Sequence, residues 1–200
     1  MKKIICVLSF LMSLGLVAQT TYLHCGQVFD SASGKMKKEQ TIVVEDNLII
    51  AINKGYTTVE SDSIQLIDLK AKTVYPGFID MHVHIESESN PQAYLNRYRL
   101  NEADVAYDAA VYAERSLMAG FTTVRDMGGS GVNIALRNAI AKGKIPGPRI
   151  FTAGKTLAST GGHGDPTNGN KDDFQGDPGP KQGVVNSVED ARKAVRQRYK

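Results

Sequence analysis

Residues 76–84 read PGFIDMHVH, and this stretch decides the fold class. Successive side chains of a β-strand point to opposite faces of the sheet. The odd positions are all apolar, namely Ile79, Met81, Val83 and Ile85, and the even positions are all able to bind a proton or a metal, namely Asp80, His82 and His84. Both faces are therefore occupied. A parallel α/β barrel gives a strand this arrangement, because helices cover one face and strand ends line the active site.

His82 and His84 project from the same face of this predicted strand and can hold one cation between them. Neutral imidazole suits zinc and other divalent ions of the first transition row. Two histidines in an ordinary strand are the alternative, but the preceding Pro-Gly, the apolar alternation and Asp80 favour a metal site. Asp80 either touches the metal shell or makes a hydrogen bond inside the barrel.

The rest of the chain predicts short strands first and alternating strands and helices afterwards. Before the central stretch we expect strands at 22–29, 41–44, 48–52 and 64–69, separated by turn residues. After it we expect a loop at 86–99, helices at 102–119, 132–141 and 188–199, strands at 121–125 and 149–153, and a long loop at 159–183. The order β-α-β-α-β predicts a parallel sheet with right-handed crossovers.

Two further stretches, AGFTTVRDMGG at 119–129 and PRIFTAGKTLASTGGHGD at 148–165, complete a recognisable set. Together with PGFIDMHVH they resemble the amidohydrolase superfamily, in the branch of imidazolonepropionase-like enzymes and Xaa-Pro dipeptidases. The resemblance implies a (β/α)8 TIM barrel beside a small β-sandwich domain. We therefore expect residues 19–75 to be part of the sandwich and residues 76–200 to be the first three βα units of a barrel, because a complete barrel needs about 250 residues.

The resemblance also implies an activity. A metal-dependent amidohydrolase would cleave a C–N amide bond through activated water, in a dipeptide or in a cyclic or N-acyl amino acid. His82 and His84 would bind one or two divalent ions, with zinc expected. The other ligands and the catalytic aspartate would lie beyond Lys200, so no catalytic residue is assigned here and the 200 residues alone are expected to be inactive.

Three more side chains are candidates near this site. Arg125 and Asp126 end the second predicted barrel strand, and we expect an ion pair that supports the barrel mouth, with substrate contact as the alternative. His163 lies in a Gly-Gly-His-Gly loop. By position alone such a histidine is exposed, whereas the family resemblance favours contact with a carboxylate or carbonyl oxygen of the substrate.

The first 18 residues predict a signal peptide and hence export to the periplasm or the exterior. Lys2 and Lys3 precede an apolar run at 4–17, and Ala18 is a suitable cleavage point. Without those two lysines the chain has 22 basic and 21 acidic residues, so the formal net charge falls from +3 to +1. A charge this small does not indicate a nucleic-acid partner. We expect no membrane anchor after cleavage, and self-association of the full-length protein remains open.

Two rival hypotheses stay open at this point. One is an exported small-molecule binding protein on the same fold without catalysis. The other is a free-standing domain of different function.

Overall fold

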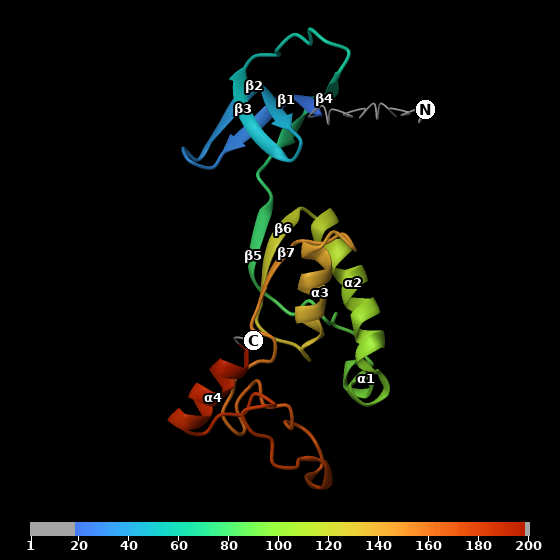
Figure 1. Ribbon diagram of the computed structural model, residues 1–200, viewed down its shortest axis with the longest axis vertical. Coiled ribbons are helices and arrows are strands. Elements are labelled where there is room, and N and C mark those ends of the chain that lie inside the picture. Colours follow the sequence, from blue (N-terminus) through green and yellow to red (C-terminus); the bar gives the residue numbers. More distant parts are fainter. Residues whose placement is uncertain (1–18, 199–200) are drawn as a thin grey trace, which may run out of the picture. The chain divides into compact units, whose positions relative to one another are not determined.

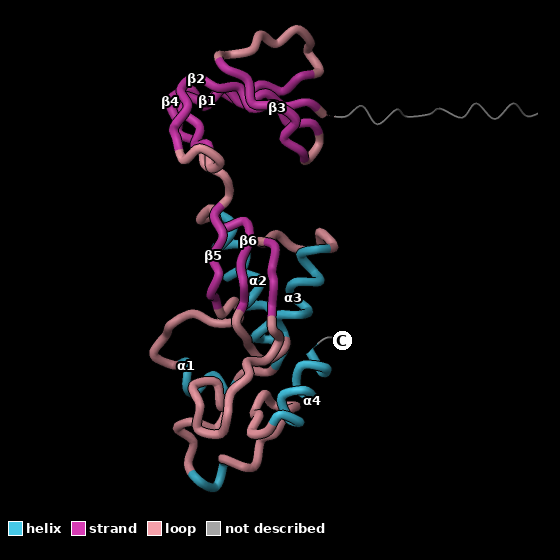
Figure 2. The backbone as a smooth tube through the Cα atoms, turned by 90° about the vertical axis from the view of Figure 1, so that its left-hand side faces the viewer, coloured by secondary structure: helices cyan, strands magenta, loops and turns pink. Residues whose placement is uncertain are grey.

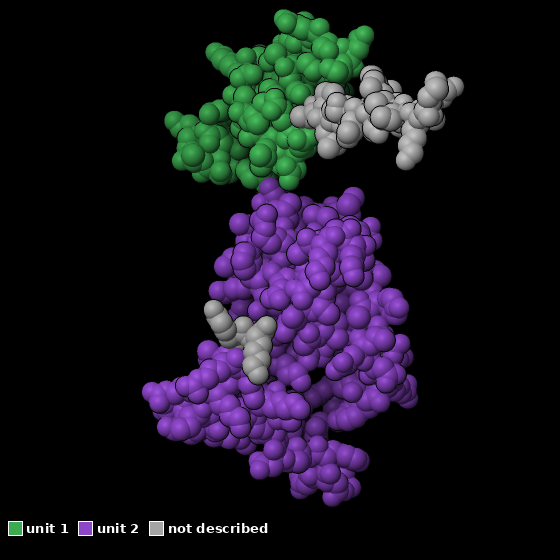
Figure 3. All heavy atoms as spheres, in the orientation of Figure 1, with its two compact units in different colours: residues 1–76 green, residues 77–200 purple. Residues whose placement is uncertain are grey.

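The computed structural model describes residues 19–198, and the chain divides into two units after Pro76 (Figure 3). The predicted signal peptide, residues 1–18, lies outside the described residues. Within the described part, no helix is both long enough and apolar enough to cross a membrane. Each unit is considered by itself below.

The first unit is a four-stranded sheet with the strand order β3-β2-β1-β4 (Figure 1). Its strands are β1 (Thr20–Asp30), β2 (Lys35–Glu45), β3 (Leu48–Lys54) and β4 (Ile64–Val74). Consecutive strands from β1 to β3 are antiparallel, and β1 is parallel to β4. Cys25, Val28 and Ile42 form its buried apolar cluster. The strands agree with the sequence pattern but run further; β2 begins at Lys35 because its charged first half pairs with the second half of β1.

A buried threonine holds the segment after β3 onto this sheet. The Thr41 hydroxyl donates to the Gly55 carbonyl at 2.8 Å and accepts from the Thr57 amide at 2.9 Å. His24 Nε2 lies 2.9 Å from the Thr57 carbonyl, so residue 57 is held from two strands. Thr41 itself has no exposed surface.

We therefore expect Thr41→Val, which keeps the shape but not the hydroxyl, to lower the free energy of unfolding by about 1–3 kcal/mol, because two backbone groups lose their partner. Chemical denaturation of the full-length protein measures the change. Thr73→Val on the exposed side of β4 is the matched control, and a surface change of this kind stays within about 0.5 kcal/mol. Equal stability of the two variants would contradict the role given to Thr41.

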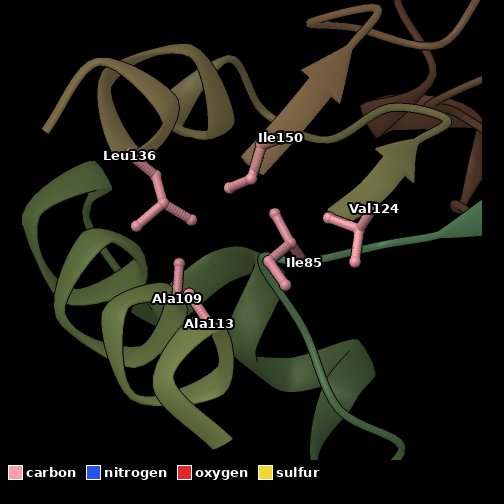
Figure 4. Packing of buried hydrophobic residues seen from close by; sticks show 6 residues of the cluster. All are labelled: Ile85, Ala109, Ala113, Val124, Leu136 and Ile150. Carbon is pink, nitrogen blue, oxygen red and sulfur yellow. The ribbon is translucent and has the colours of Figure 1, made fainter. Parts of the chain in front are cut away.

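The second unit carries three parallel strands in the order β5-β6-β7 (Figure 2). These are β5 (Phe78–Val83), β6 (Phe121–Asp126) and β7 (Arg149–Thr152), connected through α2 (Glu102–Met118) and α3 (Val132–Ala141). Both helices pack on one face of the sheet. Figure 4 shows the core between them, in which six buried side chains converge: Ile85, Ala109, Ala113, Val124, Leu136 and Ile150. The predicted α/β class is confirmed.

The apolar odd positions of the central stretch do not all face the helices. Ile79 and Met81 are 60% and 54% exposed, whereas Ile85 is buried. The register explains the difference. Ile79 pairs with Thr123, whose neighbour Val124 points into the helical core, so Ile79 faces away from the helices. The register then shifts between Asp80 and Val83, which brings Val83 onto the helical side.

The segment at 86–99, predicted as a loop, contains the helix α1 (Ala93–Arg99). Its seven residues are too few for a periodic apolar pattern, and no residue of it is buried. It is held by polar contacts with a later loop: Tyr98 donates to Asn170 Oδ1 at 2.8 Å, and Arg97 donates to the Pro166 carbonyl.

The long loop at 159–183 is irregular apart from the short helix η1 (Asp172–Phe174). The helix α4 (Val188–Arg198) follows it. The Ser187 hydroxyl accepts from the Asp190 amide at 3.0 Å and so satisfies a free amide at the start of this helix.

Candidate metal and substrate site

His82 and His84 lie together at the carboxyl end of β5 and its extension. Their ring centroids are 5.5 Å apart, with an edge-to-face angle of 67°, and both side chains are exposed. The strand β5 opens the second unit, and the two histidines are two residues apart. Both imidazoles therefore lie where a cation can reach them. The pair is thus available for binding rather than packed into a core.

The ring of His84 is oriented by the loop after β6. His84 Nδ1 lies 2.8 Å from the Gly128 carbonyl, which can only accept a hydrogen bond. Nδ1 therefore carries a proton, and in the neutral ring the lone pair of Nε2 is available to a metal. Metal-binding histidines characteristically donate their second ring N–H to a carbonyl or carboxylate, and this bond fixes tautomer and direction.

Asp126 in turn holds Gly128. The carboxylate is buried and accepts from the Gly128 amide at 3.0 Å, from Asn133 Nδ2 at 2.8 Å and from the Thr152 hydroxyl at 3.3 Å. It thereby connects the ends of β6 and β7 with the first turn of α3. Gly128 has a φ of 136°, and a Cβ there would collide with Thr156, so glycine is required at this position.

The predicted ion pair between Arg125 and Asp126 does not form in the described chain. Neighbouring strand residues point to opposite faces. Asp126 points toward α3, whereas Arg125 is exposed and donates from Nε to the Met81 carbonyl at 2.7 Å. Arg125 thus bonds to the strand that carries the histidines, and Asp126 supports the loop that orients one of them.

Asp80 does not join the imidazoles as a third ligand. Its Oδ1 accepts from the His82 amide at 2.9 Å, and its register partner is Val124. Asp80 lines a cavity of about 300 Å³ between β5 and α2, together with Val83, His84 and Tyr112. Because of the register shift, Asp80 lies on the helical side and stabilises the backbone of His82 instead.

A second cavity of about 520 Å³ opens beside His84. It is bounded by the segment after β5, by α1 and by α2, and its lining includes Arg97 and the acidic residues Glu86, Glu88, Glu102 and Asp108. Tyr112 lies between the two cavities. Burial raises the pKa of the Tyr112 phenol, and the nearby Asp108 and Glu88 carboxylates add to the shift. This phenol therefore stays protonated and can donate a hydrogen bond.

His163 is exposed and is not among the residues that line the cavity beside His84. Pro166 of the same loop does line it. The loop itself is held by Asp165, a buried residue that the sequence reasoning passed over. Asp165 accepts from the Gly161 amide at 2.8 Å, from the Thr167 amide at 2.8 Å and from the Thr167 hydroxyl at 2.7 Å.

These hydrogen bonds lower the pKa of the Asp165 carboxyl, with the Thr167 amide contributing most. A lowered pKa in the folded protein means that the stabilisation is complete above the ordinary carboxyl pKa and is lost as the pH falls through the lowered value. We expect Asp165→Ala at neutral pH to speed amide hydrogen exchange at Gly161 and Thr167, and wild-type exchange, corrected for its intrinsic pH dependence, to speed up in acid. Asp173→Ala in the same loop, whose partner is the exposed Lys171, should leave both amides protected.

The donor set fits a divalent ion in part. His82 and His84 offer imidazole nitrogens as ligands, and the hydrogen bond to Gly128 fixes the direction of His84 Nε2. In residues 19–198 no group of three or more His, Cys, Asp or Glu side chains comes close enough to enclose an ion. A hydrolytic zinc centre uses about three protein ligands and leaves one position open. The pair therefore supplies two ligands of such a centre.

Comparison with known proteins agrees with this arrangement. The model of the amidohydrolase family matches residues 73–200, well over half of the chain. The chain belongs to the amidohydrolase family. The matched region contains the three barrel strands, both histidines and the Asp126 network.

Solved members of related enzymes share the fold over nearly the whole chain. A Xaa-Pro dipeptidase solved with methionine in its active site is 44% identical, with a TM-score of 0.82 over 90% of this chain and 44% of that one. A prolidase in complex with N-methylphosphonate-L-proline is 33% identical, with a TM-score of 0.74 over 90% of this chain and 44% of that one. Ochratoxinase of Aspergillus niger is 25% identical over 158 residues, which are 74% of this chain and 31% of that protein. The chain thus spans less than half the length of these relatives.

Proposed function

We propose that this chain is part of an exported, metal-dependent amidohydrolase that cleaves the amide bond of a dipeptide, with Xaa-Pro dipeptides as the first substrates to test. The observation that carries the proposal is the His82–His84 pair, in which the Gly128 carbonyl leaves His84 Nε2 free. The 44% identity to a Xaa-Pro dipeptidase supports the substrate class.

In this proposal the residues of the chain have separate tasks. His82 and His84 hold a divalent ion, with zinc expected, and further ligands come from outside residues 19–198. Such an ion would activate water and polarise the scissile carbonyl. The cavity beside His84 admits part of the substrate. Glu88 is paired with Arg115, but the carboxylates in the lining still outnumber its cation Arg97, which favours a cationic group such as the free amine of a dipeptide. His163 contacts a carboxylate or carbonyl oxygen of the substrate, with its loop held by Asp165.

The test uses the full-length protein. Hydrolysis is measured with Xaa-Pro dipeptides, other dipeptides and N-acyl amino acids, before and after removal of metal by a chelator and again after addition of Zn²⁺. We expect turnover of at least one dipeptide, its loss on chelation and its recovery with Zn²⁺. Binding of a dipeptide by calorimetry without turnover in any metal state would instead support a binding protein on this fold.

Export is tested separately by fractionation of cells that express the full-length gene. We expect a mature protein that begins near Gln19 and is found outside the cytoplasm. A soluble cytoplasmic product that retains Met1 would contradict this part of the proposal.

A further inference from the structure

Glu86 joins the segment after β5 to the start of α3. Its Oε1 accepts from the Asn133 amide at 2.6 Å, and its Oε2 accepts from the Ser130 amide at 2.6 Å. Both amides belong to the first turn of a ten-residue helix and the loop before it. Amides at a helix N-terminus have no partner within the helix, and the helix dipole favours a negative charge there. The carboxylate therefore binds this end of α3 with two charge-assisted hydrogen bonds.

This contact lies beside the bond that orients His84. His84 and Glu86 are two residues apart, and they contact Gly128 and Ser130, which are also two residues apart. The segment after β5 is thus tied to the segment after β6 at two successive points. With the His84–Gly128 hydrogen bond alone, the His84 ring could turn about that bond. The Glu86–Ser130 hydrogen bond also fixes the backbone that carries the ring.

Gly129, between the two contact points, leaves room for this arrangement. A Cβ at position 129 would collide with the carboxylate of Glu86. The collision is with the end of a flexible side chain, so an alanine there would displace the carboxylate and spare the backbone. The backbone of Gly129 also donates to the Gly154 carbonyl at 2.8 Å, which holds this loop against the end of β7.

We propose that Glu86 is a positioning residue for the metal site: by binding Ser130 and Asn133 it sets the direction of the free Nε2 of His84. The proposal rests on the proposed function, since it assumes that His84 binds a metal. Glu86 also lines the cavity beside His84, but both of its carboxylate oxygens already accept from backbone amides. Its effect passes through the backbone of residues 84–86 and through the loop at 128–130.

The experiment measures Zn²⁺ affinity and the visible absorption spectrum of the Co²⁺-substituted full-length protein. The variants are Glu86→Ala, Glu86→Gln, Gly129→Ala and His84→Ala. Asp104→Ala is the matched control, because Asp104 also binds a helix N-terminus: its carboxylate accepts from the Asn101 amide at 2.8 Å at the start of α2, and Asp104 is not among the residues that line the cavity beside His84. Thermal unfolding of every apo variant measures the purely structural part of each change.

We expect Glu86→Ala and Gly129→Ala to weaken Zn²⁺ binding about 10- to 100-fold, the range seen when residues that orient metal ligands are lost. Glu86→Gln should lie between them and the wild type, because an amide keeps one acceptor oxygen. The Co²⁺ spectrum should change in Glu86→Ala and Gly129→Ala. Asp104→Ala should lower the unfolding temperature and leave affinity and spectrum unchanged.

Three results would overturn the inference. If the Glu86 and Gly129 variants bind Zn²⁺ as the wild type does, while His84→Ala does not, Glu86 has no positioning role and the proposed function stands. If Asp104→Ala weakens binding equally, the effect is one of general stability. If His84→Ala binds as tightly as the wild type, the metal site itself is wrong. Should Glu86→Ala fail to fold, Glu86→Gln and Gly129→Ala decide the question.

Discussion

Replacement of His82 or His84 with alanine should lower kcat/KM of the full-length enzyme at least about 100-fold and remove most of its bound metal. Metal ions contribute several kcal/mol to transition-state stabilisation, and each 1.4 kcal/mol corresponds to a factor of ten in rate. Each variant removes one of two adjacent imidazoles, and the described chain offers no third donor beside them to replace it. Elemental analysis and dipeptide hydrolysis measure the two quantities.

His163→Ala is the control for this prediction. His163 is exposed and lies in a different loop, so its loss should leave the metal content intact and either raise KM or lower kcat. Unchanged metal and activity in both His82→Ala and His84→Ala would contradict the ligand assignment. Loss of metal in His163→Ala would mean that this histidine is a ligand.

Asp126→Ala should lower the free energy of unfolding by about 3–5 kcal/mol, because a buried charged hydrogen-bonding partner is lost. The Gly128 amide, Asn133 Nδ2 and the Thr152 hydroxyl all donate to this carboxylate, which is 1% exposed. Asn133 Oδ1 is buried without a partner in the described structure, so Asn133 is held here through its Nδ2 group alone. A loss of this size is a large share of the 5–15 kcal/mol that stabilises a typical protein.

Urea denaturation of full-length Asp126→Ala, Asp126→Asn and Glu114→Ala tests this prediction. Asn keeps one oxygen for the Gly128 amide but turns an amide group toward Asn133, so a smaller loss is expected. Glu114 is an exposed carboxylate on α2, and its removal should change stability by less than about 0.5 kcal/mol. An Asp126→Ala protein as stable as Glu114→Ala would show that the network contributes little.

Much of the barrel unit follows from local sequence patterns. The bounds of α3 at Val132 and Ala141 were predicted to the residue, because apolar spacing and flanking glycines mark both ends. The strands β6 and β7 differ from their predicted ends by one residue. The H-x-H spacing alone predicts that His82 and His84 share a face, since the period of a strand is a property of the backbone.

Other features arise only when strands and loops meet. The register of β5 against β6 exposes Ile79 and pairs Asp80 with Val124 on the helical side, and a shift in register leaves no mark in the alternation itself. Arg125 and Asp126 are neighbours in sequence, yet Asp126 accepts from Asn133 of α3, whereas Arg125 donates to the backbone of the neighbouring strand β5. The α1 helix is too short to show a period, and contacts with a loop about 70 residues away hold it.

Glu86 shows this division most clearly. It continues the even positions of His82 and His84, so the sequence determined on which face it would emerge from an extended strand. Its partners, Ser130 and Asn133, are more than 40 residues away and become available only when the start of α3 meets the segment after β5. The sequence by itself determined which residues could bind a metal. The tertiary structure decided which backbone groups orient them, because a hydrogen bond depends on positions that local periodicity does not encode.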